Sequence, residues 1–311
     1  MKNYLVTGGA GFIGSCLSRD LLNEKQSVYI IDNLTTGFRE NVPQGAIFIE
    51  GFCEDEKILS QLKGVCFDAI FHIAGQSSGE VSYDNPVLDM QANVQSTLVL
   101  IKFALENGCK NFIYASSMSV YGDAAILPVN EQMETSPKSF YAVGKLASEH
   151  YLRVYRQFGI KTIALRLFNV YGEGQNLTNL RQGMASIYLA QALRSGKILV
   201  KGAPERFRDF IHISEVVAAF KKAKEESIPS GIYNVCRGDK VTVAEILKLI
   251  NSSLEKPVSI EFVEGTPGDQ FGIYGSPIHF EKTFGLKSNI SFSQGMTEMI
   301  AWAKSKYYEN S

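Results

Sequence analysis

Short apolar runs alternate with segments of helical periodicity through the first half of the chain. Residues 2–7 and 27–31 are rich in β-forming apolar side chains, and residues 13–23 between them repeat apolar positions at helical spacing. Further strands are expected at 46–49, 69–73, 111–115 and 161–167, with helices at 54–62, 88–106 and 141–158. Continuous apolar strands separated by helices are typical of a parallel sheet covered on both faces. We therefore predict an α/β fold built on a doubly wound parallel sheet.

The pattern changes after residue 168. Helices are expected at 184–195, at 241–254 and near residue 311, with short strands between them and a stretch rich in Gly and Pro at 265–275. No repeat or obvious linker separates this part from the first. We predict one domain over residues 1–168 and a smaller lobe over residues 169–311 that is interleaved with it.

Composition narrows the possible functions. The 311 residues include 31 Lys and Arg against 32 Asp and Glu, so the net charge of −1 gives no basic field that would attract nucleic acid or an anionic membrane. No apolar run has the length of a signal peptide or a membrane span, which favours a cytoplasmic protein. The five cysteines are scattered without C-x-x-C spacing, so neither a disulfide framework nor a metal site is expected.

A glycine pattern follows the first expected strand. Residues 7–15 read TGGAGFIGS, which places Gly8, Gly11 and Gly14 at G-x-x-G-x-x-G spacing between a strand and a helix. Glycine lets the backbone approach a pyrophosphate closely, and the helix N-terminus presents unpaired N–H groups to it. Asp32 ends the second strand, where a carboxylate accepts from a ribose 2′-OH and repels a 2′-phosphate. The pattern predicts a Rossmann site for NAD rather than NADP, with the substrate held mainly by the second lobe.

Two serines, Ser116 and Ser117, directly follow the strand expected at 111–115, in the stretch ASSMSVYG. Tyr141 and Lys145 lie on one face of the next expected helix because they are four residues apart. A neighbouring ammonium and a positive nicotinamide ring favour ionisation of the phenol, which can then act as a general base near neutral pH. Ser117 is the natural hydroxyl to bind the same substrate oxygen. With the glycine pattern, these residues predict a catalytic set of Ser117, Tyr141 and Lys145.

Motifs over nearly the whole chain carry a resemblance to a known family. They are TGGAGFIG, DNLTTG at 32–37, HIAGQSS at 72–78, SSMSVYG, YAVGK, RLFNVYG at 166–172 and RFRDFIH at 206–212. By these motifs the sequence resembles the extended short-chain dehydrogenase/reductases, in particular the nucleotide-sugar epimerases and dehydratases, and most of all the UDP-sugar 4-epimerases.

The resemblance implies roles for individual residues. NAD would contact Gly8, Gly11, Phe12, Ile13, Gly14, Asp32, Asn33, Ala74, Asn93, Tyr141 and Lys145. Ser117 and Tyr141 would perform catalysis with Lys145, and a UDP-sugar substrate would contact Gln76, Ser117, Asn169, Arg208 and Asp269. Related enzymes pair the helices expected at 88–106 and 141–158 in a four-helix bundle, and apolar residues there such as Leu98, Leu105, Tyr151 and Tyr155 exceed what one helix face requires. We therefore also expect a homodimer.

The residues after Ser117 separate the subclasses of that family. Related 4,6-dehydratases carry an Asp-Glu pair, and UDP-glucuronate decarboxylases usually a glutamate, where this chain has Met118 and Ser119. What remains suits inversion at C4 of a UDP-hexose or UDP-N-acetylhexosamine through a transient 4-keto sugar, with tightly bound NAD. A nucleotide-sugar dehydratase or a 4-keto reductase of the same family is the alternative, and a non-catalytic NAD-binding scaffold is a further one.

Three positions depart from the pattern of the related epimerases. Thr266 stands where an arginine for the diphosphate is common, and Arg181 is a candidate to replace it. Phe52 stands where an aspartate usually contacts the adenine. Ile273 lies near the position where bulk is thought to exclude an N-acetyl group, and its medium size leaves plain and N-acetylated hexoses open.

Several polar residues also have structural interpretations. His72 and His212 lie in apolar runs and are expected to be structural rather than catalytic. Arg206 and Arg208 alternate along a strand-like run, so the alternative that one of them faces water stays open. Gln76 follows a strand end, where a substrate contact and a polar turn are both open.

Overall fold

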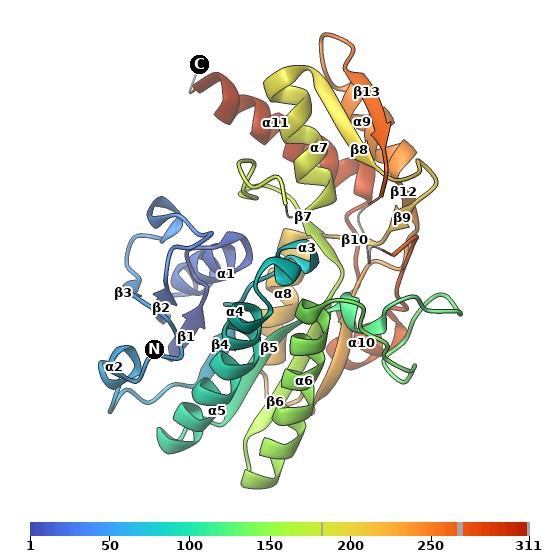
Figure 1. Ribbon diagram of the computed structural model, residues 1–311. Coiled ribbons are helices and arrows are strands. Elements are labelled where there is room, and N and C mark those ends of the chain that lie inside the picture. Colours follow the sequence, from blue (N-terminus) through green and yellow to red (C-terminus); the bar gives the residue numbers. More distant parts are fainter. Residues whose placement is uncertain (182, 266–269, 310–311) are drawn as a thin grey trace.

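The computed structural model describes residues 1–181, 183–265 and 270–309, with side chains as far as residue 306. Within these ranges one sheet contains β1 (Asn3–Thr7), β2 (Ser27–Asp32), β3 (Ile47–Glu50), β4 (Ala69–His72), β5 (Asn111–Ser117), β6 (Lys161–Leu167) and β11 (Gly231–Val235). Their order across the sheet is β11-β6-β5-β4-β1-β2-β3, and every neighbouring pair is parallel. The doubly wound parallel sheet predicted from the sequence is confirmed (Figure 1).

Helices pack on both faces of this sheet. One face carries α1 (Phe12–Asn23), α8 (Ile213–Ala223) and α10 (Ile278–Phe284), and the other carries α2 (Glu56–Ser60), α5 (Ser96–Glu106) and α6 (Phe140–Tyr155). Successive side chains of a strand point to opposite faces. Tyr4 and Val6 of β1 therefore join the core under α1, whereas Leu5 joins the core under α5. Because both faces are covered, each strand is apolar without alternation.

The helix expected at 88–106 is irregular. A short helix that the pattern did not indicate, α3 (Gly79–Asp84), comes first. α4 (Pro86–Met90) begins at a cap from Asn85, a π-helical turn (Gln91–Gln95) follows, and α5 completes the run. Such turns are rare and frequently lie at functional sites. This one contains Asn93, a predicted cofactor contact, which is almost fully buried.

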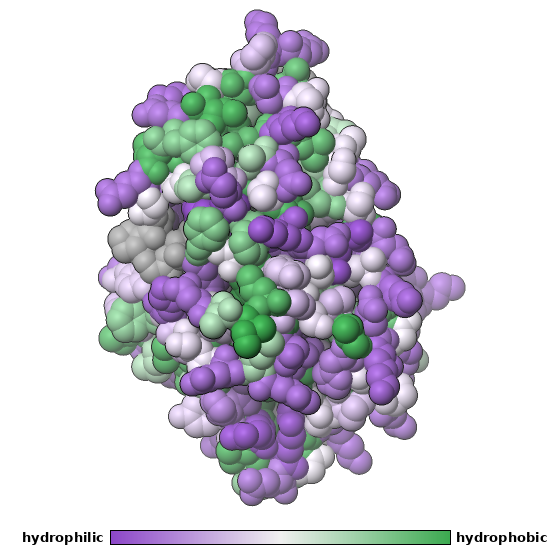
Figure 2. Space-filling view, turned by 90° about the vertical axis from the view of Figure 1, so that its right-hand side faces the viewer, coloured by the Kyte–Doolittle hydropathy of each residue, from purple (hydrophilic) through white to green (hydrophobic). Residues whose placement is uncertain are grey.

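A second lobe has a core of its own. It contains α7 (Met184–Ser195), α9 (Val243–Ser252) and α11 (Phe292–Glu309), with the strand pairs β8 (Lys197–Lys201) and β13 (Ser259–Val263), β9 (Phe207–Arg208) and β12 (Val241–Thr242), and β7 (Asn169–Tyr171) and β10 (Phe210–His212). In Figure 1 this lobe lies above the sheet. On the face shown in Figure 2 the larger apolar areas lie in its upper part, over this lobe. Leu199, Ile260 and Phe262 of β8 and β13 are exposed apolar residues of this lobe.

The lobes exchange segments. β11, α8 and α10 follow residue 168 but pack into the sheet, with β11 directly beside β6. α8 was not expected, although Ile213, Val216, Val217 and Phe220 repeat at helical spacing and are all buried. Residue 168 therefore marks where the chain first leaves the sheet, and the functional division at that point stays a prediction.

Three general features bear on function. None of the helices in the described ranges combines the length and apolar character needed to cross a bilayer. All five cysteines are free thiols. Among the described side chains, no three His, Cys, Asp or Glu residues converge in a way that could hold a metal ion.

Candidate active site

The loops that follow β1 and β4 touch at the switch point of the sheet, where ligands of doubly wound folds bind. Gly8 has φ +74°, and a Cβ there would lie 2.7 Å from the backbone N of Ala74. A Cβ on Gly14 would lie 2.1 Å from the carbonyl O of Gly8. The protein's own backbone therefore requires glycine at both positions, in the tight turn that the sequence predicts.

The N-terminus of α1 adjoins this turn without a side-chain cap. Gly11 is the N-cap residue, so no side chain competes for the first N–H groups, which suit an anion. Asp32, at the end of β2, accepts from the backbone N–H of Ala10 (3.0 Å) and of Leu34 (2.8 Å). A carboxylate has about four acceptor sites, so Asp32 retains capacity for a ribose hydroxyl. Of the other predicted cofactor contacts, Phe12, Ile13 and Ala74 are half-buried and Asn33 is exposed.

A buried acceptor lies in the same region. Asn93 Nδ2 donates to the carbonyl O of Gln76 (3.0 Å) and to Asp89 Oδ1 (3.2 Å), but Asn93 Oδ1 has no hydrogen-bond partner among the described residues. That oxygen and Lys145 Nζ lie 2.5 Å and 3.4 Å from the point that a Cβ on Gly75 would occupy. Buried polar atoms are normally hydrogen-bonded. A ligand bound against Gly75 would complete the bonding of Asn93, as the predicted cofactor contact requires.

The predicted catalytic residues meet where β5 ends and α6 begins. Ser117 is the last residue of β5, and a Ser139 side-chain cap starts α6, which places Tyr141 and Lys145 in its first two turns. Lys145 Nζ donates to the carbonyl O of Ala115 (2.9 Å) and lies 5.7 Å from the centre of the Tyr141 ring. All three catalytic side chains are at most 9% exposed. A reaction at this point proceeds shielded from bulk water.

Burial controls the protonation of this pair. Desolvation raises the pKa of Tyr141 to about 12, opposed by a hydrogen bond with Ser117. Desolvation also lowers the pKa of Lys145 to about 8, opposed by the carboxylates of Asp89 and Glu149. The sequence led us to expect a phenol that ionises near neutral pH, but in the protein alone desolvation outweighs its neighbours. The oxidised nicotinamide ring adds the further positive charge that favours phenolate.

A buried ion pair that the sequence analysis did not single out lies beside the catalytic set. Glu149 of α6 accepts from Arg166 Nε (2.9 Å) and Nη2 (2.7 Å), and also from the hydroxyl of Ser116. Both charged side chains are at most 3% exposed. The pair fixes α6 against β5 and β6 and so orients the helix that carries Tyr141. Both residues lie near motifs quoted above, but a single sequence shows their charges and not their pairing.

A cavity of about 340 Å³ opens next to Ser117, the serine that is predicted to act in catalysis. Its wall includes Met118 and Ser119, which follow Ser117 directly, and the predicted substrate contact Asn169. Its described lining has one carboxylate, that of Glu80, and the cations Lys138, Arg181, Lys201, Arg206 and Arg208. This excess of positive charge suits a diphosphate.

A larger cleft, of about 1330 Å³, lies elsewhere. Helices α1, α7 and α11 contribute to its wall. None of the described residues predicted to bind substrate or to act in catalysis lines it. The smaller cavity is therefore the candidate substrate site, because it adjoins the catalytic residues.

Arg208 is held firmly at the cavity wall. Its guanidinium donates to the carbonyl oxygens of Gln270 (2.8 Å) and Phe207 (2.8 Å). Burial lowers its pKa to about 10, so it stays charged at neutral pH. Arg206 is also buried, so the alternative in which one of these two arginines faces water is wrong.

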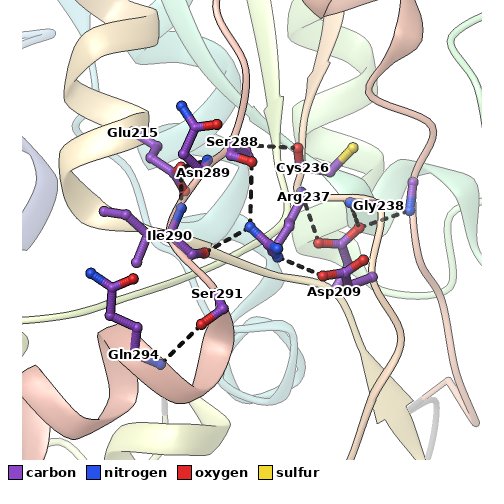
Figure 3. A network of polar contacts seen from close by, with 12 residues as sticks. Asp209, Glu215, Cys236, Arg237, Gly238, Ser288, Asn289, Ile290, Ser291 and Gln294 are labelled. Atoms are coloured by element: carbon purple, nitrogen blue, oxygen red, sulfur yellow. Dashed lines mark hydrogen bonds and ion pairs between the residues drawn. The ribbon is translucent and has the colours of Figure 1, made fainter.

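Asp209 joins Arg208 to Asn169 and to the segment before α11. The carbonyl O of Asp209 accepts from the backbone N–H and from Nδ2 of Asn169, both at 3.0 Å. Its carboxylate accepts from the backbone N–H groups of Arg237 (3.0 Å) and Gly238 (2.9 Å). Figure 3 shows that Arg237 in turn donates to the carbonyl oxygens of Ser288 and Ile290. The network holds two predicted substrate contacts in one unit.

The two histidines have structural surroundings. His72 Nδ1 lies 2.8 Å from Thr7 Oγ1, and its Nε2 lies 3.1 Å from Thr97 Oγ1. Burial lowers the pKa of His72 to about 3, so the ring is neutral. His212 Nδ1 lies 2.8 Å from Ser214 Oγ and caps α8. These surroundings agree with the structural interpretation from the sequence.

Four other predicted positions are not found in the described cavity wall, for different reasons. Asp269 and Thr266 are outside the described residues. The side chain of Gln76 does not belong to the described lining, since its amide donates to Asp89 Oδ1 (2.7 Å) and to the carbonyl O of Ser78 (2.7 Å). Ile273 is fully buried in an apolar cluster, and its side chain does not belong to the described lining of the cavity.

Arg181 does line the cavity, as its proposed role requires. Its Nη1 lies 2.7 Å from Asp84 Oδ2, and its Nε lies 3.4 Å from Glu80 Oε1. Both acids belong to α3, so Arg181 links the loop before α7 to that helix.

A comparison with family profiles identifies the chain. The profile of the NAD dependent epimerase/dehydratase family matches residues 4–236. The chain belongs to this family. The resemblance inferred from the sequence motifs, to the extended short-chain dehydrogenase/reductases, is confirmed, and so is NAD as the cofactor. The glycine turn, the uncapped end of α1 and the unpaired Asn93 Oδ1 all fit that cofactor.

Several similar members of the family carry epimerase names, and others are named UDP-glucuronic acid decarboxylase or dTDP-4-dehydro-6-deoxyglucose reductase. A putative UDP-glucose 4-epimerase of Methanocaldococcus jannaschii is 30% identical over 302 residues, which are 96% of this chain and 98% of that protein. The structure of a Thermotoga maritima UDP-glucose 4-epimerase with UDP-glucose matches with a TM-score of 0.92 at 29% identity, covering 98% of this chain and 99% of that chain. A UDP-N-acetylglucosamine 4-epimerase of Methanobrevibacter ruminantium, in complex with UDP-N-acetylmuramic acid, gives the same values.

Proposed function

We propose that this family member is a nucleotide-sugar 4-epimerase that inverts C4 of a UDP-hexose or UDP-N-acetylhexosamine. The observation that carries the proposal is the enclosed set of Ser117, Tyr141 and Lys145 beside a cation-lined cavity. The residues directly after Ser117, Met118 and Ser119, supply no second acid or base. One base and one hydride acceptor suffice for C4 inversion. The epimerase names of several similar proteins support the same reaction class, and the decarboxylase and reductase names of others fit the alternative within the family.

The chain's residues divide the chemistry between them. Tyr141 accepts the proton of the C4 hydroxyl, and Ser117 donates a hydrogen bond to the same oxygen as it becomes a carbonyl. Lys145 holds positive charge beside the phenolate. NAD, held by the glycine turn and Asn93, would supply the hydride acceptor for C4 and the hydride donor for the return step. The 4-keto sugar turns over between the two transfers, and Tyr141 then returns the proton to the oxygen, so each cycle ends with no net redox change.

The diphosphate is assigned to the cationic end of the cavity. Arg208 supports this assignment because its guanidinium is buried, is held by two carbonyl oxygens and lines the cavity. Asn169 is held on the same unit by Asp209. A planar guanidinium is well suited to phosphate oxygens. The identity of the sugar follows from neither feature, and the buried position of Ile273 removes that side chain as a simple size gate.

The experiment that tests this function uses four substrates. The purified protein is incubated separately with UDP-glucose, UDP-galactose and their N-acetylated counterparts, without added NAD(P)H, and the products are resolved by NMR. We expect interconversion of one or both C4 pairs. A stable 4-keto-6-deoxy product would instead identify a dehydratase, and a reaction that consumes added NAD(P)H would identify a 4-keto reductase. Bound NAD without any turnover of a nucleotide sugar would favour the scaffold.

Arg181 and Arg208 are expected to differ in their contribution to substrate binding. In Arg181→Gln we expect KM to rise roughly 3- to 10-fold with little change in kcat, because this exposed cation also pairs with Glu80 and Asp84. Arg208→Gln removes a buried, preorganised charge and is expected to raise KM by roughly 30-fold or more. Initial rates over a range of UDP-sugar concentrations measure both. An unchanged KM in Arg181→Gln would remove Arg181 as the replacement for the arginine missing at Thr266.

We also propose a homodimer formed through α4 and α6. Of the residues named from the sequence, Leu105 and Tyr155 pack against the sheet core, Leu98 is half-buried and only Tyr151 is exposed. The support comes from a broader set of exposed apolar side chains on these two adjoining helices and just beyond: Val87, Leu88, Met90, Phe140, Val143, Tyr151, Val154 and Phe158. A large exposed apolar patch commonly marks an interface.

A cytoplasmic location stays a prediction.

A single charge should disrupt this dimer. Val154→Glu places a carboxylate in the patch, and we expect the native mass to change from twice the chain mass to the chain mass at micromolar concentration, because a buried unpaired charge is costly. Ile278→Glu, on the opposite face of the sheet, is the matched control because Ile278 is 71% exposed. Light scattering after size-exclusion chromatography measures both. An unaltered mass in Val154→Glu would place any dimer interface elsewhere.

A further inference from the structure

Asp89 is a buried acid with no role in the chemistry described above. It is the fourth residue of α4 and is 1% exposed. Its Oδ1 accepts from Gln76 Nε2 (2.7 Å) and from Asn93 Nδ2 (3.2 Å). Its Oδ2 is buried and has no hydrogen-bond partner among the described residues. A carboxylate kept in such a place normally has a charged partner.

The free oxygen of Asp89 faces the helix that carries the base. Oδ2 lies 3.6 Å from the point that a Cβ on Gly144 would occupy. Gly144 stands between Tyr141 and Lys145 on α6, and α4 packs directly against α6. A Cβ at 144 would be in van der Waals contact with Asp89 and in tight contact with Asn93 Cβ, at 3.3 Å. The glycine lets a negative charge approach the catalytic helix closely.

The other ionisable groups around α4 are already paired, neutral or remote. On α6, Glu149 is bound by Arg166 and the Ser116 hydroxyl. On α3, Glu80 and Asp84 pair with Arg181 at the surface, and Tyr83 donates to the carbonyl O of Lys138. In the sheet, His72 is neutral between two threonines, and burial keeps Tyr114 protonated. Among the described residues, Asp89 is therefore the carboxylate whose charge acts on both Lys145 and Tyr141, whereas Glu149, bound by Arg166, acts on Lys145 alone.

Asp89 also connects the base to the cavity. The Gln76 amide that donates to Asp89 also donates to the carbonyl O of Ser78, and its oxygen accepts from the N–H of Ser78. Ser78 lines the cavity, and its hydroxyl donates to the carbonyl O of Arg181 (2.8 Å). A displacement of Asp89 would therefore also displace Gln76 and Ser78, and Ser78 belongs to the cavity wall.

We propose that Asp89 is a positioning residue for the reaction: its charge balances Lys145 beside the catalytic tyrosine, and its Oδ1 fixes Gln76 behind the cavity wall. The inference rests on the proposed epimerase function. The direction of the expected pKa change follows from electrostatics, since a nearby negative charge raises the pKa of both Lys145 and Tyr141. Removing that charge is expected to lower both apparent pKa values of the coupled Tyr141–Lys145 pair.

The test compares pH profiles of the NAD-containing protein. For the UDP-sugar that is turned over, we expect both limbs of kcat/KM to move to lower pH, by about 0.5–1 unit, in Asp89→Asn and in Asp89→Ala. Asp89→Glu keeps the charge and is expected to move them by less than half as much. Asp89→Ala also removes one of the two acceptors of the Gln76 amide, so the KM of this variant should rise more than that of Asp89→Asn. The control Glu106→Gln removes an exposed charge from α5 and should leave the profile unchanged.

A second readout works without turnover and separates this inference from the proposed function. The tyrosinate absorbance of each protein is titrated against the same protein carrying Tyr141→Phe, which isolates the ionisation of Tyr141. A shift to lower pH in both neutral variants supports the inference even if no UDP-sugar is converted. Unshifted curves overturn it. A packing role for Asp89 would give a different result: both neutral variants would lose bound NAD, Asp89→Glu would retain it, and no tyrosinate titration would shift. That result would also overturn the inference.

Discussion

In Tyr141→Phe, kcat for C4 epimerisation is expected to fall by about 10³-fold or more, with NAD still bound and the fold intact. Phenylalanine preserves the ring in its buried place but removes the oxygen that is proposed to take the C4 hydroxyl proton. The loss should appear in kcat more than in KM, because the phenol acts on the reacting atoms rather than on the diphosphate. Initial rates and the NAD content of the purified protein measure these effects.

A tyrosine on the same helix provides the matched control. Tyr155 of α6 packs against the sheet core, away from the cavity, so Tyr155→Phe should change kcat by no more than about two-fold. Activity in Tyr141→Phe within ten-fold of the parent would mean that another group takes the proton. Ser117 would then be the first candidate, since its hydroxyl is bonded to Tyr141 and to Ser119.

Gly14→Ala is expected to abolish NAD binding and to lower the free energy of unfolding by roughly 2–3 kcal/mol. The new methyl group would lie 2.1 Å from the carbonyl O of Gly8 and 2.9 Å from the Cα of Gly9. Both neighbours are backbone atoms in the tight turn, so the clash cannot be relieved by a side-chain rotation. Denaturant unfolding of the NAD-free protein and the NAD content after purification provide the two measurements.

Gly11→Ala separates the needs of the fold from those of the cofactor. At Gly11 a Cβ would lie 3.2 Å from the carbonyl O of Gly8, and φ is −82°, a value that alanine adopts readily. We therefore expect near-normal stability of the NAD-free protein and weaker NAD binding, because the methyl group would stand at the end of α1 where the pyrophosphate is expected. Equal stability of Gly14→Ala and the parent would show that the turn is more adaptable than its geometry indicates.

The sequence predicted those parts of the molecule that depend on neighbours in the chain. The β1 turn, α1 and Asp32 form one continuous segment, so local pattern and chemistry were sufficient to place them. Tyr141 and Lys145 share a helix face at any α-helical register, and the extent of β6 was obtained to the residue. The family motifs then joined these segments into one site.

The missed features depend on contacts between distant segments. The pairing of Glu149 with Arg166 and the approach of Asp89 to Gly144 arise only when α4, α6 and β6 pack together. The burial of Ile273 likewise depends on how a loop after β13 folds back onto Val120 and Phe168. The π-helical turn around Asn93 interrupts a run whose apolar spacing alone predicts one regular helix. The elevated pKa of Tyr141 follows from enclosure, which no local pattern reports.

The central claim is that the hydrogen at C4 leaves the sugar and returns to the opposite face of the same carbon. The most direct measurement uses UDP-glucose, or whichever UDP-sugar proves to be the substrate, labelled with deuterium at C4 and converted in ordinary water. The epimeric product is expected to keep the deuterium at C4, because hydride moves between the sugar and a cofactor that stays bound. Replacement of the deuterium by solvent hydrogen, or its appearance at another carbon, would contradict the account.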